Sequence, residues 1–333
     1  MKAVVVREFG PIGAAKLEDF PSPEPGAREV LIEVALAPVN FVDSLVLTGS
    51  YQFLPERPFV PGKGPVGTIC KVGEKVENLK VGDRVLAMAE SGGYAEYALA
   101  GEENCYPLPD TLSFEDAASI SLAFDTAWFS LFERGRLREG ETVLVLGATG
   151  AVGDAALQLA KARGARVLAG VSSMDKAPAV IAAGADAAID LSVTDLRANL
   201  REQVYAANAG QGVDVVIDML GGDFFMAALR SIAWRGRAVV VGFASGEIPS
   251  VKINYLMLKN IEVSGVQISD YRKRTPDLVQ QCYEEIFALC VAGLITPRPV
   301  QAFGIEDYGR ALTSLIERRL SGRAVLDMRG LEK

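Results

Sequence analysis

Three glycines at regular spacing have the pattern of a turn that binds the pyrophosphate of a dinucleotide. Gly147, Gly150 and Gly153 stand between an expected strand and an expected helix. Residues without a Cβ let backbone amides approach a pyrophosphate, and the helix N-terminus adds a favourable dipole. The spacing alone is a weak signal, but its position between strand and helix strengthens it. We predict a dinucleotide site with the amides of Ala151 and Val152 as donors, rather than a tight turn without a ligand.

The end of the next expected strand distinguishes NADPH from NADH. An NAD site usually places an acidic residue there for the ribose hydroxyls, whereas hydroxyls and cations suit a 2′-phosphate. Here the strand ends in Ser172 and Ser173, and Lys176 follows one helical turn later. Asp175 lies near the spacing of the NAD acid, but past the strand end. We therefore predict NADPH, with a merely solvated lysine at position 176 as the alternative.

The elements that position this turn alternate along the chain. From Val143 to Gly242, short apolar strands alternate with helical segments. This pattern predicts βαβ units and a parallel sheet covered by helices on both faces. Residues 223–236 are expected to form one helix, followed by a strand at residues 237–242. After that strand, Gly242, Phe243 and Ser245 are expected near the nicotinamide ribose.

The first third of the chain has a different pattern, which predicts a compact and mostly antiparallel β unit. Proline and glycine separate the short expected strands at residues 2–6, 29–37, 67–73, 83–88 and 93–100. From Ser113 to Gly135 the period becomes helical, with Asp116 completing a capping box. A closing strand at residues 323–328 is expected to return to the first unit, which would make the nucleotide-binding region an insertion.

Composition narrows the class of protein. A chain of 333 residues exceeds the usual size of one hydrophobic core, so two domains are expected. A formal charge of -8 and a pI near 4.9 argue against the basic surface that binds nucleic acid. The sequence contains no run of about 18 apolar residues and no pattern of a secretion signal. We expect a soluble, cytoplasmic protein with neither nucleic-acid nor membrane partners.

A metal mechanism is not expected. The four cysteines are scattered without a CxxC pair, and the sequence contains no histidine. A zinc site would need Cys, His or carboxylate ligands brought together. We predict no metal site and interpret Cys70, Cys105, Cys282 and Cys290 as small buried hydrophobic residues.

The whole chain resembles the zinc-independent quinone oxidoreductases, the zeta-crystallin-like branch of the medium-chain dehydrogenase/reductase superfamily. The segments that carry the resemblance are, in order, NFVDSLVLTGSY, PGKGPVGTICKVGEKVENLKVGDRV, GATGAVG, VDVVIDMLGG and GRAVL. The resemblance implies an α/β protein with a GroES-like, β-rich catalytic domain at residues 1–123 and 267–333. Between these pieces it implies a doubly wound Rossmann domain at residues 124–266 that binds NADP. It also implies a homodimer joined through the last Rossmann strand, in the segment IEVSGV.

The sequence departs from its relatives at several positions. Zinc-dependent members carry a catalytic cysteine and a GHE segment, where this chain has Asn40 and the segment GKG at residues 62–64. Zinc-free relatives usually have glutamate at the position of Gly64, and many have a tyrosine near Leu191 that helps hold the 2′-phosphate. Lys63 is expected either to approach the cleft or to be a solvated loop lysine. Asp125 stands where relatives usually have a small residue, directly before the pair Thr126 and Ala127.

A protein without metal or histidine is better suited to hydride addition to a conjugated acceptor than to alcohol oxidation. We therefore expect NADPH-dependent reduction of a quinone or another α,β-unsaturated carbonyl. Asn40 is the candidate donor to the developing oxyanion, Thr126 orients the nicotinamide, and Tyr51 shapes the pocket or supplies a proton. The alternatives are a turn residue at Asn40 and a half-buried loop aromatic at Tyr51. Asp43 is expected to fix the loop rather than to touch substrate.

Two other functions stay open from the sequence. One is reduction of an enoyl thioester, in which the segment YRKR at residues 271–274 meets coenzyme A phosphates, although a solvated helix start explains it as well. The other is an NADPH-binding protein with negligible turnover.

Overall fold

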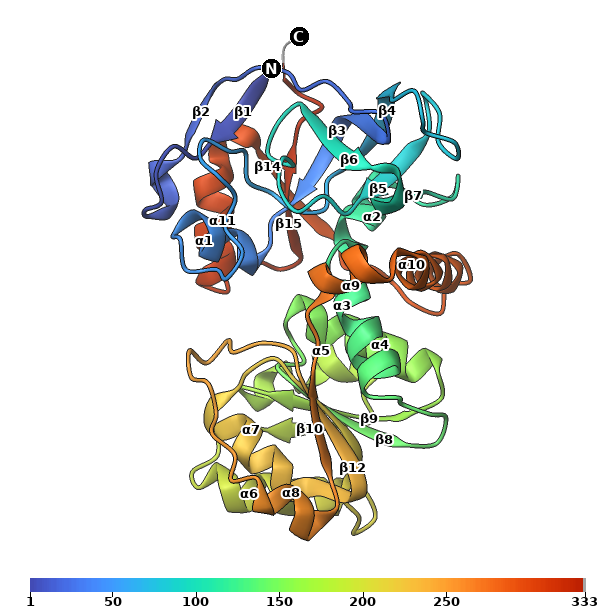
Figure 1. Cartoon of the computed structure of the whole chain (residues 1–333). Helices are drawn as coiled ribbons and strands as arrows, with labels where there is room; N and C mark the ends of the chain where they lie inside the picture. The colour runs from blue at the N-terminus through green and yellow to red at the C-terminus, as the bar shows by residue number, and fades with distance from the viewer. Residues whose placement is uncertain (332–333) are drawn as a thin grey trace. The chain divides into compact units, whose positions relative to one another are not determined.

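A computed structural model describes residues 1–331, which divide into two compact units (Figure 1). Unit 1 contains Met1–Leu122, Arg272–Val291 and the described chain from Pro297 onward. Unit 2 contains Ala123–Tyr271 and Ala292–Thr296. The domain boundaries given above stay a prediction, and each unit is described by itself.

Unit 2 is built on a six-stranded sheet in the order β10-β9-β8-β11-β12-β13, and every neighbouring pair is parallel. Helices α4 and α5 cover one face, and α6 and α7 cover the other (Figure 1). This confirms the α/β class and the predicted parallel sheet. The strands are β8 Thr142–Leu146, β9 Arg166–Val171, β10 Ala187–Asp190, β11 Val213–Asp218, β12 Ile232–Val240 and β13 Glu262–Gly265. The helices are α3 Ala123–Trp128, α4 Ala151–Ala162, α5 Ala177–Ala182, α6 Leu196–Ala207, α7 Gly222–Ala228 and α8 Asn254–Lys259.

The helix predicted at residues 223–236 is wrong in its second half. Helix α7 and a 3-10 turn, Leu229–Ser231, end before Ile232, which already pairs with Val213 as the first residue of β12. The register of this pair shifts after Val213, and Arg235 has a positive φ of 65°. Pairing within the sheet therefore overrides a helical pattern that continued across a bulged strand.

The helical stretch predicted from residue 113 to residue 135 is divided. Helix α2, Phe114–Ile120, keeps the predicted Ser113–Asp116 capping box. The chain then breaks at Leu122, whose φ is 61°, before α3 begins at Ala123. A π-helical segment, Phe129–Arg134, follows α3 directly.

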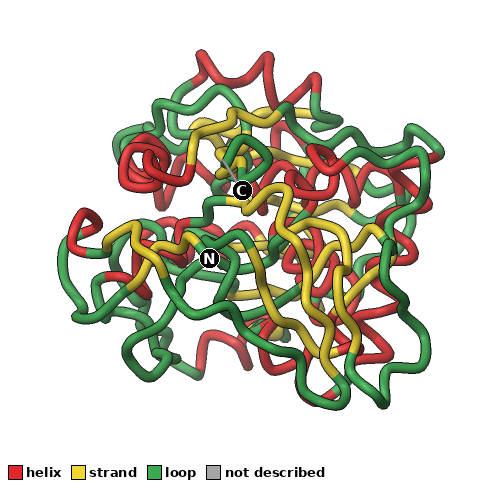
Figure 2. The backbone as a smooth tube through the Cα atoms, turned by 90° about the horizontal axis from the view of Figure 1, so that it is seen from above, coloured by secondary structure: helices red, strands yellow, loops and turns green. Residues whose placement is uncertain are grey.

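Unit 1 contains a seven-stranded, mostly antiparallel sheet in the order β14-β15-β3-β4-β5-β7, with β6 paired to β3. Strand β15 pairs antiparallel with β3, which confirms the predicted return of the closing strand to the first part of the chain. Loops connect β4 to β5 and β5 to β6. Figure 2 shows the strands in yellow and the loops and turns in green. The strands are β3 Glu29–Pro38, β4 Val66–Val72, β5 Arg84–Ala87, β6 Tyr97–Gly101, β7 Cys105–Pro107, β14 Val300–Gly304 and β15 Arg323–Asp327.

Smaller elements complete unit 1. Strands β1 Lys2–Val5 and β2 Lys16–Asp19 form a separate antiparallel pair. The remaining helices are α1 Phe41–Leu47, α10 Pro276–Val291 and α11 Tyr308–Ile316, and α9 Ile268–Arg274 crosses the boundary between the units in sequence. Short 3-10 turns of unit 1 lie at Ile12–Ala14, Glu102–Asn104 and Ile305–Asp307, and one of unit 2 lies at Met174–Lys176.

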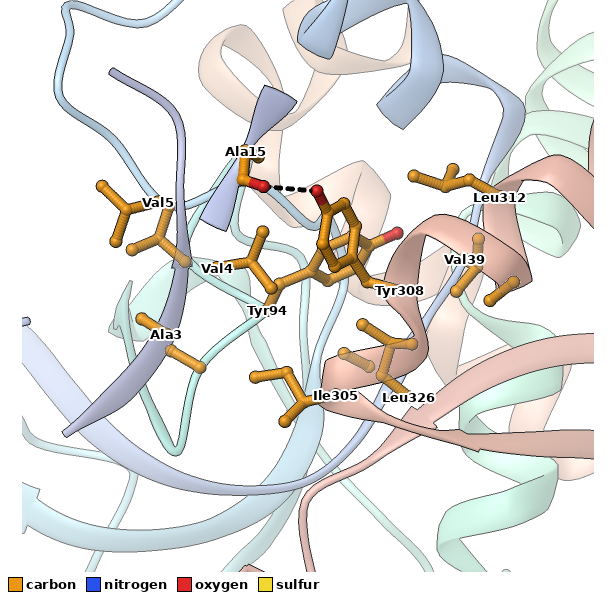
Figure 3. Packing of buried hydrophobic residues seen from close by; sticks show 14 of the residues in the cluster. Ala3, Val4, Val5, Ala15, Val39, Tyr94, Ile305, Tyr308, Leu312 and Leu326 are labelled. Carbon is orange, nitrogen blue, oxygen red and sulfur yellow. Dashed lines mark hydrogen bonds between the residues drawn. The ribbon is translucent and has the colours of Figure 1, made fainter. Parts of the chain in front are cut away.

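Two tyrosines lie among the aliphatic side chains of the unit 1 core (Figure 3). Tyr308 donates to the carbonyl of Ala15 over 2.6 Å. Tyr94 is fully buried, so its hydroxyl also needs a partner inside the protein. That partner is the carboxylate of Asp43, 2.9 Å away, which links the core to the polar site described below.

Among residues 1–331, none of the helices combines the length and the apolar character that crossing a bilayer requires.

Candidate functional site

The predicted glycine turn lies between β8 and α4 and is a tight turn that requires glycine at two positions. Gly147 has a φ of 78°, which favours glycine. A Cβ on Gly153 would lie 2.3 Å from the carbonyl oxygen of Gly147, so a side chain there would displace the turn. The first helical hydrogen bond runs from Asp154 to Gly150, so the amides of Ala151 and Val152 precede it in the first helical turn.

Ser172 and Lys176 meet at the end of the adjacent strand, β9. Lys176 Nζ donates to Ser172 Oγ over 2.9 Å. The hydroxyl of Ser173 instead bonds Asp175, accepting from its backbone N–H at 3.3 Å and donating to its carboxylate at 3.2 Å. Because β8 and β9 are parallel neighbours, these side chains and the glycine turn lie along the same edge of the sheet.

The segment predicted for the nicotinamide ribose follows β12 at that same edge. The backbone amides of Ala244 and Ser245 donate to Met219 and Leu220, each over 3.0 Å. Phe243 is exposed and lies against Gly221, where an added Cβ would be 2.8 Å from its ring. Gly242 joins this loop to β12, so the predicted cofactor residues of unit 2, apart from Thr126, follow β8, β9 and β12.

Asp218 is a residue of this edge that the sequence reasoning missed. It ends β11, is fully buried, and accepts from the amides of Leu220 and Gly221 at 2.9 and 3.1 Å. Burial raises the pKa of this carboxyl, while the two backbone hydrogen bonds oppose that shift. Leu220 in turn lies beside Gly147, 3.1 Å from a Cβ built there. Asp218 therefore fixes the turn that packs against the glycine turn. In the sequence, Asp218 stands within the motif VDVVIDMLGG, which could have marked it as a residue of this edge.

Thr126 lies in the first turn of α3, in unit 2. Its backbone N–H donates to the carboxylate of the preceding residue, Asp125, over 2.6 Å. Asp125 is fully buried, and Ser130 donates to the carbonyl of Thr126 over 2.6 Å. Asn40 and Tyr51 belong to unit 1, so the grouping of these three predicted catalytic residues stays a prediction.

Asn40 and Asp43 anchor a buried polar site in unit 1. Asn40 precedes α1, and its backbone N–H donates to Asp43 Oδ2 over 2.8 Å. Arg323, at the start of β15, donates from Nη2 to Asn40 Oδ1 over 2.9 Å. Because arginine only donates, this contact also fixes which end of the amide is oxygen. The expectation that Asp43 holds the loop is confirmed, and Tyr94 and Arg323 are partners that the sequence reasoning missed.

The electrostatics of Asp43 follow from its burial. Desolvation raises the pKa of this carboxyl from 3.8 to about 6. Hydrogen bonds from the Asn40 backbone and from Tyr94 oppose the shift, as do the charges of Lys63 and Arg323. Burial and the neighbouring Asp43 carboxylate raise the pKa of the Tyr94 phenol well above its usual value. The site therefore favours a neutral Tyr94 beside a carboxyl that titrates near neutral pH.

Tyr51 and Lys63 are neighbours in unit 1. Tyr51 is half-buried and packs partly against the core, as the loop-aromatic interpretation expects. Lys63 is only 6% exposed, so the interpretation as a solvated loop lysine is wrong. It forms an ion pair with Glu90, and Nζ lies 5.5 Å from the centroid of the Tyr51 ring.

The segment YRKR at residues 271–274 is only partly exposed to solvent. Arg272 is 4% exposed and donates to Glu90 over 3.0 Å. Tyr271 packs on Phe129, with ring centroids 4.5 Å apart. Lys273 lies over the exposed ring of Phe53. Arg272 therefore has an internal partner, which weakens the expectation that this segment binds coenzyme A phosphates.

The cysteines are dispersed in the structure as in the sequence. All four are free thiols. Cys105 and Cys282 are buried as predicted, whereas Cys70 and Cys290 are only half-buried, so the interpretation as buried residues is wrong for these two. Within residues 1–331, no group of three or more His, Cys, Asp or Glu side chains is arranged to hold a metal ion.

The raised pKa of Asp43 predicts a pH-dependent stability. A carboxyl with a raised folded-state pKa stabilises the fold below pH 3.8 and loses that contribution as the pH rises through about 6. A shift of this size corresponds to roughly 3 kcal/mol. Asparagine keeps an acceptor for Tyr94 but does not ionise. The stability of Asp43→Asn relative to the wild type should therefore rise between pH 4 and pH 7, measured by urea unfolding.

The control is Asp110→Asn, the same substitution at an exposed position of unit 1. For this control, the difference in unfolding free energy from the wild type should not change with pH. The same pH-independent difference for Asp43→Asn would show that burial does not raise the pKa of Asp43.

Comparisons with known proteins agree with this geometry. Residues 26–110 match the alcohol dehydrogenase GroES-like domain, and residues 151–284 match the family described as zinc-binding dehydrogenase. The chain is 34% identical to quinone oxidoreductase-like protein 2 of Rattus norvegicus, covering 92% of this chain and 87% of the relative. It is also 34% identical to a quinone oxidoreductase of Pseudomonas aeruginosa, covering 98% and 99% of the two chains.

Solved structures give the same result. A quinone oxidoreductase of Pseudomonas syringae matches with a TM-score of 0.90 at 30% identity, covering 98% of this chain and 99% of the other. The Escherichia coli quinone oxidoreductase complexed with NADPH matches with a TM-score of 0.89 at 27% identity, covering 98% and 100%. With a GroES-like segment, a parallel Rossmann sheet and this similarity over nearly its whole length, the chain belongs to the quinone oxidoreductase branch of the medium-chain dehydrogenase/reductase superfamily.

Proposed function

We propose that this protein is an NADPH-dependent, zinc-independent reductase that transfers a hydride to a quinone or another α,β-unsaturated carbonyl. The observation that carries the proposal is the sheet edge of unit 2, where the glycine turn, the Ser172–Lys176 pair and the Phe243 loop follow parallel strands. The relative from Escherichia coli is a quinone oxidoreductase complexed with NADPH. The cytoplasm is the proposed compartment.

The residues of this edge fit NADPH. The tight turn, in which a Cβ on Gly153 would collide with the Gly147 carbonyl, brings the backbone close to the helix start, and the amides of Ala151 and Val152 there suit a pyrophosphate next to Gly147 and Gly150. Lys176 and Ser172 offer a cation and a hydroxyl in contact, which suits a 2′-phosphate. Thr126, Ser173, Gly242, Phe243 and Ser245 complete the proposed set. When bound, NADPH would supply the hydride.

Lys176 provides the test of cofactor choice. Lys176→Ala should weaken NADPH binding by about 1 to 3 kcal/mol, the range for a charge-assisted contact, and leave NADH binding nearly unchanged. Both affinities can be measured by fluorescence titration. Lys252→Ala, at an exposed position of the same unit, controls for the loss of a surface charge. Equal losses for both cofactors would contradict the assignment of Lys176 to the 2′-phosphate.

Asn40 and Tyr51 are the proposed acceptor-side residues. Arg323 engages the oxygen of the Asn40 amide, so Nδ2 is the end that can donate to an acceptor's oxygen. Its recorded contact, to the carbonyl of Pro38, is 3.4 Å and therefore weak. A donor at this point stabilises the oxygen of a conjugated carbonyl as hydride reaches the β-carbon. Tyr51 offers a ring to pack a planar acceptor and a hydroxyl to donate a proton.

Activity assays test the reaction class. Quinones or enones should be reduced, and saturated ketones should not, because the proposed donors polarise an isolated carbonyl less than a metal does. Asn40→Ala should lower kcat by about ten- to a thousandfold with little change in NADPH affinity. Because this variant also removes an acceptor from buried Arg323, its unfolding must be measured in parallel. A large loss in Tyr51→Phe would assign the proton to Tyr51.

Enoyl thioesters belong in the same panel as the alternative acceptor class. Reduction of saturated ketones with no activity on quinones or enones would contradict the proposed chemistry. Cofactor binding without turnover of any acceptor would favour a binding protein.

We also propose a homodimer formed through β13. This strand ends the sheet of unit 2, and an edge strand can pair with a second chain. Val263 of this strand is exposed, and the segment that precedes it exposes Ile253 (78%), Met257 (70%) and Leu258 (69%). Light scattering should give about twice the chain mass of 35.5 kDa, and Met257→Asp should lower it. A single-chain mass for the wild type would exclude the dimer.

A further inference from the structure

Lys63 is a buried cation to which the proposed function assigns no role. Lys63 is only 6% exposed, and a lysine is almost never buried this deeply unless its charge has a partner. Its ammonium pairs with Glu90 and lies 5.5 Å from the centroid of Tyr51. A charged donor therefore lies over one face of the ring that is proposed to pack the acceptor.

The backbone around Lys63 is fixed by its two neighbouring glycines. Gly62 has a φ of 95°, and a Cβ there would lie 2.3 Å from the Tyr94 ring. Gly64 has a φ of 69°, and a Cβ there would lie 2.1 Å from Ser121 Oγ. The carbonyl of Gly62 accepts from Gly93, and the amide of Gly64 donates to Ala89. The segment is thus held in one conformation that sets the position of Lys63.

Glu90 positions the Lys63 ammonium. Its carboxylate bonds Lys63 through one oxygen and Arg272 Nη1 through the other, at 3.0 Å for Arg272. An ammonium has three N–H donors, and Glu90 is its one recorded hydrogen-bond acceptor within the described chain. Two donors can therefore address a ligand while the ion pair stays intact.

We propose that Lys63 donates a hydrogen bond to the carbonyl oxygen of the acceptor whose ring packs on Tyr51, which makes Lys63 a catalytic residue. This inference rests on the proposed function. When hydride arrives at the β-carbon of an enone, a new C–H bond forms and the π electrons shift toward the oxygen. The oxygen then carries the negative charge, while Lys63 keeps its protons and stabilises that charge in a poorly hydrated site. A proton from Tyr51 or from solvent then completes the saturated carbonyl, and the Tyr51→Phe assay described above distinguishes the two sources.

The alternative is a purely structural ion pair that holds two loops together. A structural pair would affect unfolding and leave the preference for negatively charged ligands unchanged. The proposal instead predicts that Lys63 distinguishes a neutral planar ligand from an anionic one of the same shape. Naphthoquinone and the ionised form of hydroxynaphthoquinone provide such a pair, and the anion resembles the charge that develops during reduction.

The experiment compares the wild type, Lys63→Met and Lys63→Arg, with Lys80→Met as an exposed lysine control in unit 1. Lys63→Met should lower kcat for naphthoquinone by about ten- to a thousandfold and change KM much less. Without NADPH, it should weaken binding of the hydroxynaphthoquinone anion at least about tenfold and leave neutral naphthoquinone nearly unchanged. Lys63→Arg should restore much of the anion binding, and Lys80→Met should match the wild type.

The ligand-binding measurements without NADPH test this inference separately from the proposed function. Lys63-dependent anion binding without any quinone reduction would support the site and contradict the function. Quinone reduction with unchanged kcat and anion binding in Lys63→Met would overturn the role of Lys63 and leave the function intact. If Lys63→Met does not fold, the affinities of the wild type for the two ligands test the proposal. Tighter binding of the hydroxynaphthoquinone anion would support it, and tighter binding of neutral naphthoquinone would overturn it.

Discussion

The burial of Asp43 is the constraint on which the polar site of unit 1 depends. A carboxylate removed from water must find its hydrogen bonds inside the protein, and Asp43 accepts from the Asn40 backbone and from Tyr94. These bonds fix the start of α1 and the hydroxyl of a core tyrosine at one atom. Arg323 then reaches Asn40 from the last strand of the sheet. Residues separated by most of the chain thereby determine the orientation of one amide.

At the edge of unit 2, strand pairing does most of this work. Parallel pairing brings the ends of β8, β9, β11 and β12 to one edge of the sheet, so the short turns that follow these strands meet there. The buried carboxylate of Asp218 acts there as Asp43 does in unit 1, because it holds the turn after β11 through backbone amides. The proposed cofactor edge of unit 2 thus combines backbone amides with the Ser172–Lys176 pair, whereas the proposed acceptor site of unit 1 consists of oriented side chains.

The sequence predicted the features that depend on local pattern. The glycine turn, the alternation that gives a parallel sheet and the Ser113 capping box are all encoded within a few residues. The pattern failed at Ile232, where pairing with Val213 and a bulge decide the structure. It also missed Arg323 and Tyr94, whose roles depend on partners far away in sequence. Lys63 shows the same limit, since only the folded chain reveals its burial and its pairing with Glu90.

The central claim is hydride transfer to a conjugated acceptor without a metal, and the fate of the hydride tests it most directly. Chelator-treated protein would be given cyclohexenone and NADPH deuterated at both positions of the transferring carbon, with the product analysed by mass spectrometry. The account predicts one deuterium at the β-carbon of cyclohexanone, formed at a rate that chelation does not change. A product without deuterium, or turnover that depends on added zinc, would contradict it.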